Sequence, residues 1–122
     1  MNLLELKEKV KKGIELGAEV VYIKEENLLF GLQSAIDDNE KLVFIKEKND
    51  DAKTFDFINT NYFTNMIDDI YEKRGNIDVY IGEDASYRGD DKPIKFLEFA
   101  QFPDNDNIKM LFLLMNNVEL HH

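Results

Sequence analysis

The chain of 122 residues is 43% hydrophobic and 33% charged, a mixture typical of a soluble globular protein, and its length predicts a single domain. It contains no cysteine, which excludes disulfides, thiolate nucleophiles and thiolate metal sites. Its formal net charge is -10, from 25 acidic and 15 basic side chains, so the chain as a whole repels phosphates. Nucleic-acid binding would therefore need a local basic patch.

The sequence lacks both a membrane span and a signal peptide, which bears on where the protein is located in the cell. No apolar run approaches the roughly 20 residues of a membrane span, and the N-terminal run MNLLELKEKVKK lacks the uninterrupted apolar core of a signal peptide. We therefore expect a cytoplasmic protein with no membrane partner.

The first half of the chain predicts a helix followed by three strands. Asn2 is a good capping residue for a helix whose apolar side chains recur at three- and four-residue steps, and Gly17 is placed to end it. Aromatic and β-branched residues predict a strand at 20–23, with a returning strand at 28–33 after a polar turn. The run KLVFIK at 41–46 predicts the third strand.

The second half predicts the clearest helix of the chain and then three more strands. The polar segment 47–53 joins the halves, since it is too short to separate two domains. The helix ends at Gly75, with basic residues in its last turn. Strands follow at 77–81, after Pro93, and at 108–115, where the almost wholly apolar run predicts a strand buried on both faces.

The two halves align with each other when Gly17 is laid on Gly75. This superposes the run VYI at 21–23 on VYI at 79–81, and it places Glu25 on Glu83. The alternative to a repeat is coincidence, because any unit of a helix, a glycine and a strand has a similar pattern. The apolar stripes of the two helices support this alternative, since they differ in phase under the alignment. We predict an α+β fold with antiparallel sheets, both helices on one face, and an internal repeat with approximate halves 1–48 and 53–118.

Four runs of the second half follow one another in order: FDFINTNYFTNMIDDI, IDVYIG, KPIKFLEF and IKMLFLLM. This succession resembles one domain of the DNA sliding clamps, most closely the last domain of the bacterial clamp. It covers about half of the chain by pattern and nearly all of it by element order. Where the family ends in a Met-Pro-Val type sequence, this chain has MNNV at 115–118. A full clamp ring needs six such domains, so a one-domain chain would have to form a homo-oligomer or serve another purpose.

The resemblance implies that the helices face DNA. Clamp helices line a channel and present basic side chains to the phosphates of the duplex, which here implies weak, non-specific DNA contact. Asp68, Asp69 and Glu72 share the polar face of the second helix and would repel phosphates, so a solvated face of mixed charge is the alternative. The DNA-contact candidates are Lys7, Lys9, Lys11, Lys12, Lys73 and Arg74.

The resemblance also implies a groove for a partner peptide. Clamps bind such peptides in an apolar groove beside the final strand, which here would be lined by Leu114, Met115 and Val118. Methionine supplies an adaptable surface for such binding. Ordinary core packing is the alternative, above all for Leu114 and Met115.

The residues give little support to catalysis. The only histidines are His121 and His122 at the extreme terminus, typical of a tail, and the acidic pairs lack the D-x-D-x-D-G spacing of a calcium loop. No phosphate-binding glycine loop or serine nucleophile motif is present. We therefore expect no enzyme activity, no cofactor and no metal site.

Two functions remain open. The first is a non-catalytic binding protein, either a clamp-type domain for DNA polymerase processivity or a clamp-like decoy. The alternative is a small acidic inhibitor or immunity-type protein, of the kind that phages encode, which binds a basic surface of a protein partner. A ring would form a large assembly, whereas an inhibitor would be a monomer or dimer.

Overall fold

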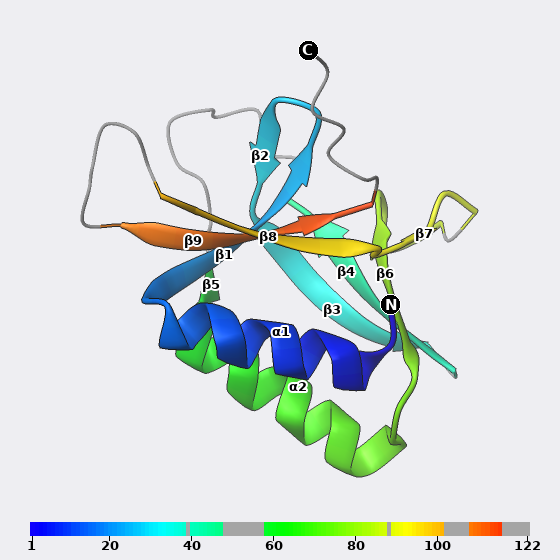
Figure 1. Ribbon diagram of the computed structural model, residues 1–122. Coiled ribbons are helices and arrows are strands. Elements are labelled where there is room, and N and C mark those ends of the chain that lie inside the picture. The colour runs from blue at the N-terminus through cyan, green and yellow to red at the C-terminus, as the bar shows by residue number, and fades with distance from the viewer. Residues whose placement is uncertain (39, 48–57, 88, 102–107, 116–122) are drawn as a thin grey trace.

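The computed structural model describes residues 1–38, 40–47, 58–87, 89–101 and 108–115, and the structural statements below concern these residues. The predicted α+β class is confirmed, and both helices lie on one side of the sheets (Figure 1). Neither helix in the described ranges is long and apolar enough to cross a membrane. In chain order the elements are α1 Leu3–Glu15, β1 Ala18–Glu25, β2 Leu28–Phe30, β3 Leu32–Asp38, β4 Lys41–Lys46, β5 Ile58–Asn59, α2 Thr60–Arg74, β6 Asp78–Gly82, β7 Lys92–Pro93, β8 Phe96–Gln101 and β9 Lys109–Leu114.

Both helices begin at an asparagine cap and end before a glycine. The side chain of Asn2 accepts a hydrogen bond from the Glu5 amide at 2.9 Å, and that of Asn59 accepts one from the Asn61 amide at 2.8 Å. Gly17 and Gly75 have φ angles of 103° and 78°, in the left-handed region that residues other than glycine rarely adopt. These glycines let the chain leave each helix and turn into the next strand.

The strands form two mixed sheets. The first sheet has the order β2-β1-β9-β8, with β5 also paired to β1, and the second sheet has the order β3-β4-β6-β7. The pairs β1/β9 and β4/β6 are parallel, while the other pairs are antiparallel. The prediction of antiparallel sheets is therefore wrong for the central pair of each sheet. These central strands come from different halves of the chain, so no hairpin fixes their direction.

The two sheets have corresponding strand orders. We call two residues counterparts when they occupy the same place in the two halves: Gly17 laid on Gly75 defines them as far as β1 and β6, and the order and register of the strands define them beyond. If every strand is exchanged for its counterpart, β2-β1-β9-β8 becomes β7-β6-β4-β3, which is the order of the second sheet. The register agrees as well, since Leu113 lies beside Ile23 in the first sheet and Phe44 lies beside Ile81 in the second.

The main core lies between the helices and the two sheets. Leu6 and Val10 of α1 and Phe63 and Ile67 of α2 are completely buried there. The rings of Phe44 and Phe63 pack with their centroids 5.3 Å apart. A second cluster covers the outer face of the first sheet, and it contains Val20, Tyr22, Met110, Phe112 and Leu114.

Helix α1 lies directly against β9 at Gly13. A Cβ atom at this position would lie 2.5 Å from Cδ2 and 2.9 Å from Cγ of Leu111, whose side chain is only 2% exposed. Because Leu111 is held in the core, it cannot move aside without disturbing its neighbours.

We therefore predict that Gly13→Ala lowers the free energy of unfolding by about 1 kcal/mol. Overpacking costs about 1–3 kcal/mol, and the better helix propensity of alanine offsets about 1 kcal/mol of that cost. Urea unfolding followed by circular dichroism measures the change, with Glu8→Ala on the exposed side of α1 as the control. A stabilising effect of Gly13→Ala would contradict this packing of α1 on β9.

Candidate functional site

Three of the six DNA-contact candidates are engaged in ion pairs. Lys7 Nζ lies 3.3 Å from Asp68 Oδ1 and 4.1 Å from the centre of the Tyr71 ring. The other two pairs are Lys73 Nζ with Asp69 Oδ2 at 3.0 Å and Arg74 Nε with Asp37 Oδ1 at 3.1 Å. Their carboxylates cancel much of the positive potential that a phosphate would feel.

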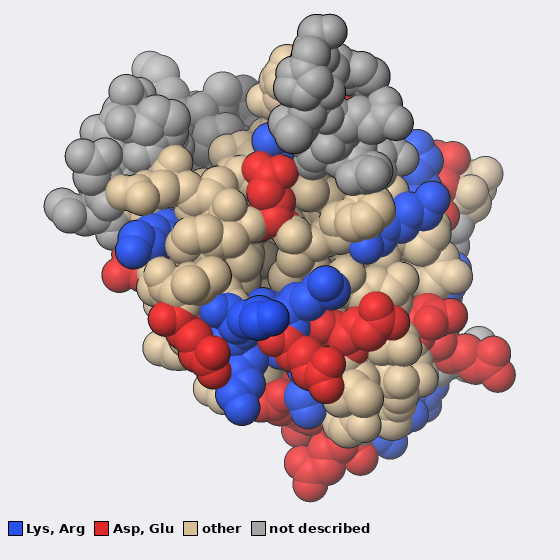
Figure 2. All heavy atoms as spheres, in the orientation of Figure 1, with Lys and Arg blue, Asp and Glu red and all other residues tan. Residues whose placement is uncertain are grey.

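The remaining candidates, Lys9, Lys11 and Lys12, are exposed on α1. Basic and acidic side chains are interleaved over the region of the helices, without a continuous basic band on the visible face (Figure 2). The two helices do lie side by side, and α1 contacts α2 through the Lys7–Asp68 pair. The fold thus brings the six DNA-contact candidates onto two neighbouring helices, but it surrounds them with acidic side chains.

The partner-groove candidates do not share one face. Leu114 belongs to the cluster on the outer face of the first sheet, whereas Met115 is packed in the main core, and each is 5% exposed. Val118 lies outside the described residues, as do His121 and His122. A peptide-binding role for Leu114, Met115 and Val118 thus stays a prediction, but Leu114 and Met115 do not line a common groove in this conformation.

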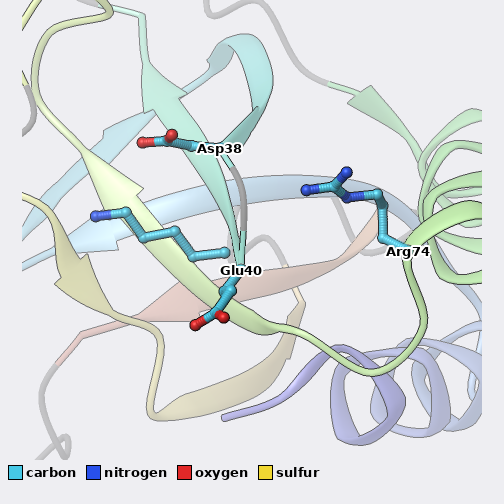
Figure 3. A pocket seen from close by; sticks show the side chains of 4 residues that line it. Asp38, Glu40 and Arg74 are labelled. Carbon is cyan, nitrogen blue, oxygen red and sulfur yellow. The ribbon is translucent and has the colours of Figure 1, made fainter.

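An open hollow of about 630 Å³ lies where the β3–β4 turn meets the end of α2. It is lined by Asp38, Glu40, Lys41 and Arg74, and in Figure 3 Arg74 extends from α2 towards the turn that carries the two acids. Both cations have acidic partners: Arg74 pairs with Asp37, and Lys41 Nζ lies 3.2 Å from Asp91 Oδ2. Counted with Asp37 and Asp91, four carboxylates therefore stand beside the two cations, so the hollow has no excess of positive charge to select an anion.

Sequence reasoning missed the burial of Asp91. Its side chain is only 2% exposed, and its Oδ1 atom has no hydrogen-bond partner within the described part of the chain. A Cβ atom on Gly82 would lie 2.6 Å from this oxygen, so only glycine lets the carboxylate lie against β6. The sequence offered no signal for this, because Asp91 follows another aspartate in a polar loop that is typical of solvated turns.

Sequence reasoning also missed Lys46, a charged residue whose side chain is only 3% exposed. Its Nζ atom lies 2.6 Å from Glu25 Oε2 and 2.6 Å from Glu83 Oε1, and 4.5 Å from the centre of the Phe30 ring. Burial alone would lower the pKa of Lys46, but hydrogen bonds and charge from the two glutamates outweigh it and raise the pKa above 10.5. Lys46 is therefore a cation at neutral pH.

Within the described ranges, no group of three or more histidine, cysteine, aspartate or glutamate side chains could hold a metal ion. The structure thus offers two helices with mixed charge, an apolar outer sheet face, a hollow lined by acids and paired cations, and the ion cluster around Lys46. Comparisons with known protein families, curated proteins and solved structures give no match.

Proposed function

We propose that this protein is a non-catalytic binding protein built like a single sliding-clamp domain, which acts as a clamp-type processivity domain or as a clamp-like decoy. The observation that carries the proposal is the correspondence of the two sheets, each completed by strands of both halves, with two helices together on one side. An internal repeat of the kind that the clamp resemblance implies would produce this correspondence. The same observation supports descent of the two halves from one unit.

The charges favour the decoy over a ring that holds DNA. Lys7, Lys73 and Arg74 each contact an aspartate, and the chain carries a net charge of -10. A surface of this kind competes for a basic site on a protein better than it binds phosphates. This observation also favours the second candidate function, a small acidic inhibitor that binds a basic surface of a protein partner.

We predict that duplex DNA retains the protein only at low salt and only through Lys9, Lys11 and Lys12. Three phosphate contacts predict an affinity that falls about 40-fold between about 50 and 200 mM salt. The triple change to glutamine at these positions should abolish retention on a DNA column. Lys73→Gln is the matched control, since Lys73 is already paired with Asp69 and its loss should change retention little.

Retention that is unaffected by the triple change would contradict this assignment of contacts. No retention of the native chain at low salt would remove the DNA-binding form of the proposal, and only the decoy and inhibitor forms would be left.

The assembly state separates a ring from the other forms. A ring of six domains would contain six copies of this 14.3 kDa chain, which is about 86 kDa. We expect the protein to elute as a monomer or dimer, because the charged helix face opposes the close packing of many acidic copies around one channel. Size-exclusion chromatography with light scattering measures the mass, and a particle near 86 kDa would overturn the decoy in favour of the ring.

A further inference from the structure

Glu25 and Glu83 are counterparts, and both contact the same atom. Glu25 is the last residue of β1, and Glu83 directly follows β6. Each places a carboxylate oxygen 2.6 Å from Lys46 Nζ. Two corresponding residues can approach one point in this way only near the axis that relates the two halves, so the ammonium group lies close to that axis.

The residue that corresponds to Lys46 is apolar. In the second sheet Ile45 lies beside Gly82, and in the first sheet Leu114 lies beside Lys24, which is the counterpart of Gly82. Leu114 therefore corresponds to Ile45, and the next residue, Met115, corresponds to Lys46. Met115 is 5% exposed in the main core. The same place in the fold is thus a methionine in one half and an ammonium group in the other.

We propose that the Glu25–Lys46–Glu83 cluster is a latch that holds the β1–β2 hairpin against the second sheet. Strand β2 has three residues and pairs only with β1 in the described structure, so its ladder alone fixes it weakly. Glu25 ties the turn end of the hairpin to β4 through Lys46, and the Lys46 ammonium also lies over Phe30 at the end of β2. Glu83 ties the same ammonium to the loop that follows β6.

Loss of the ammonium would release the hairpin without unfolding the domain. The Glu25 and Glu83 side chains are 37% and 33% exposed, so without a cation between them they can turn apart into water. Because Glu25 is carried by β1, its movement shifts the hairpin, while the helices and the main core keep their contacts. The latch is independent of the proposed binding function, since it involves neither the basic residues of α1 nor a partner.

The alkaline range gives the latch a pH dependence. Its contribution is fully present below pH 10.5, the ordinary pKa of lysine, and it is lost as the pH rises through the raised pKa of folded Lys46. The charged groups that face the ammonium in the described chain are Glu25 from β1 and Glu83 from the loop after β6. Burial raises the pKa of Tyr22, so any loss of stability from Tyr22 also falls at alkaline pH. We expect the hairpin of the native chain to open above pH 10.5. If Lys46→Met shows no such separate opening step, the opening of the native chain is caused by the latch and not by Tyr22.

Amide hydrogen exchange measured by NMR tests the latch directly. Lys46→Met introduces methionine, the residue found at the corresponding position Met115. This variant should speed amide exchange at residues 26–30 by about tenfold or more, while exchange in α1 and α2 changes little. Glu25→Ala should do the same, because it removes the ion pair that joins β1 to β4 and leaves Lys46 paired with Glu83. The matched control is Lys24→Met, which removes a lysine of β1 that lies 3.6 Å from Glu98 and 5.2 Å from the Phe112 ring centre.

The control should leave exchange at 26–30 within about twofold of the native chain. Unchanged hairpin exchange in both Lys46→Met and Glu25→Ala would overturn the proposal. A uniform increase along the whole chain in both variants would overturn it as well, since it would show that the cluster only adds to global stability. If Lys46→Met fails to fold, Glu25→Ala decides alone between these outcomes.

Discussion

The parallel pairing of β1 with β9 and of β4 with β6 is the constraint on which the rest of this structure depends. In each sheet the strand that follows a helix pairs with the last strand of the other half. Neither half can therefore complete a sheet by itself, and each would expose two central strand edges if it were separated. The contacts that close the fold join residues far apart in the chain, which ties the two halves into one cooperative unit.

The same pairing decides what the helices can do. Because each sheet takes strands from both halves, α1 and α2 are brought to one side and share one core, where Val10 and Ile67 are completely buried. Their outward residues then face solvent on a common surface, and charges of opposite sign on the two helices meet there, as in the Lys7–Asp68 pair. A surface that satisfies its own cations in this way has little positive charge left for a nucleic acid, whatever the resemblance of the architecture.

Local signals in the sequence were enough for the helices but not for the sheets. The cap at Asn2 and the glycines at 17 and 75 act within a few residues, so spacing and residue type predict them. Strand direction depends on partners from the other half, and an apolar run such as 108–115 is equally compatible with a parallel and an antiparallel neighbour. The α+β class and the shared helix face followed from the pattern of elements, whereas the parallel central pairs required the structure.

The candidate surfaces also contain one part that local sequence signals predict and another part that depends on residues far apart in the chain. The exposed lysines of α1 could be recognised from helical spacing, but the aspartates that neutralise Lys7 and Arg74 come from other elements. Lys46 was predicted only as the last residue of the strand 41–46, because its partners Glu25 and Glu83 lie in two other segments of the chain. A buried ion cluster assembled from three segments leaves no local pattern for sequence reasoning to find.

The approach of Glu25 and Glu83 to one point places a particular demand on the residue between them. Two carboxylates that approach one point in a partly buried site repel each other. Lys46 supplies a cation between Glu25 and Glu83, which offsets this repulsion and holds both carboxylates at the same point. Lys46 does so where the other half has Met115. The lysine at this strand position is thus what lets the chain keep a glutamate at both 25 and 83 close to one point.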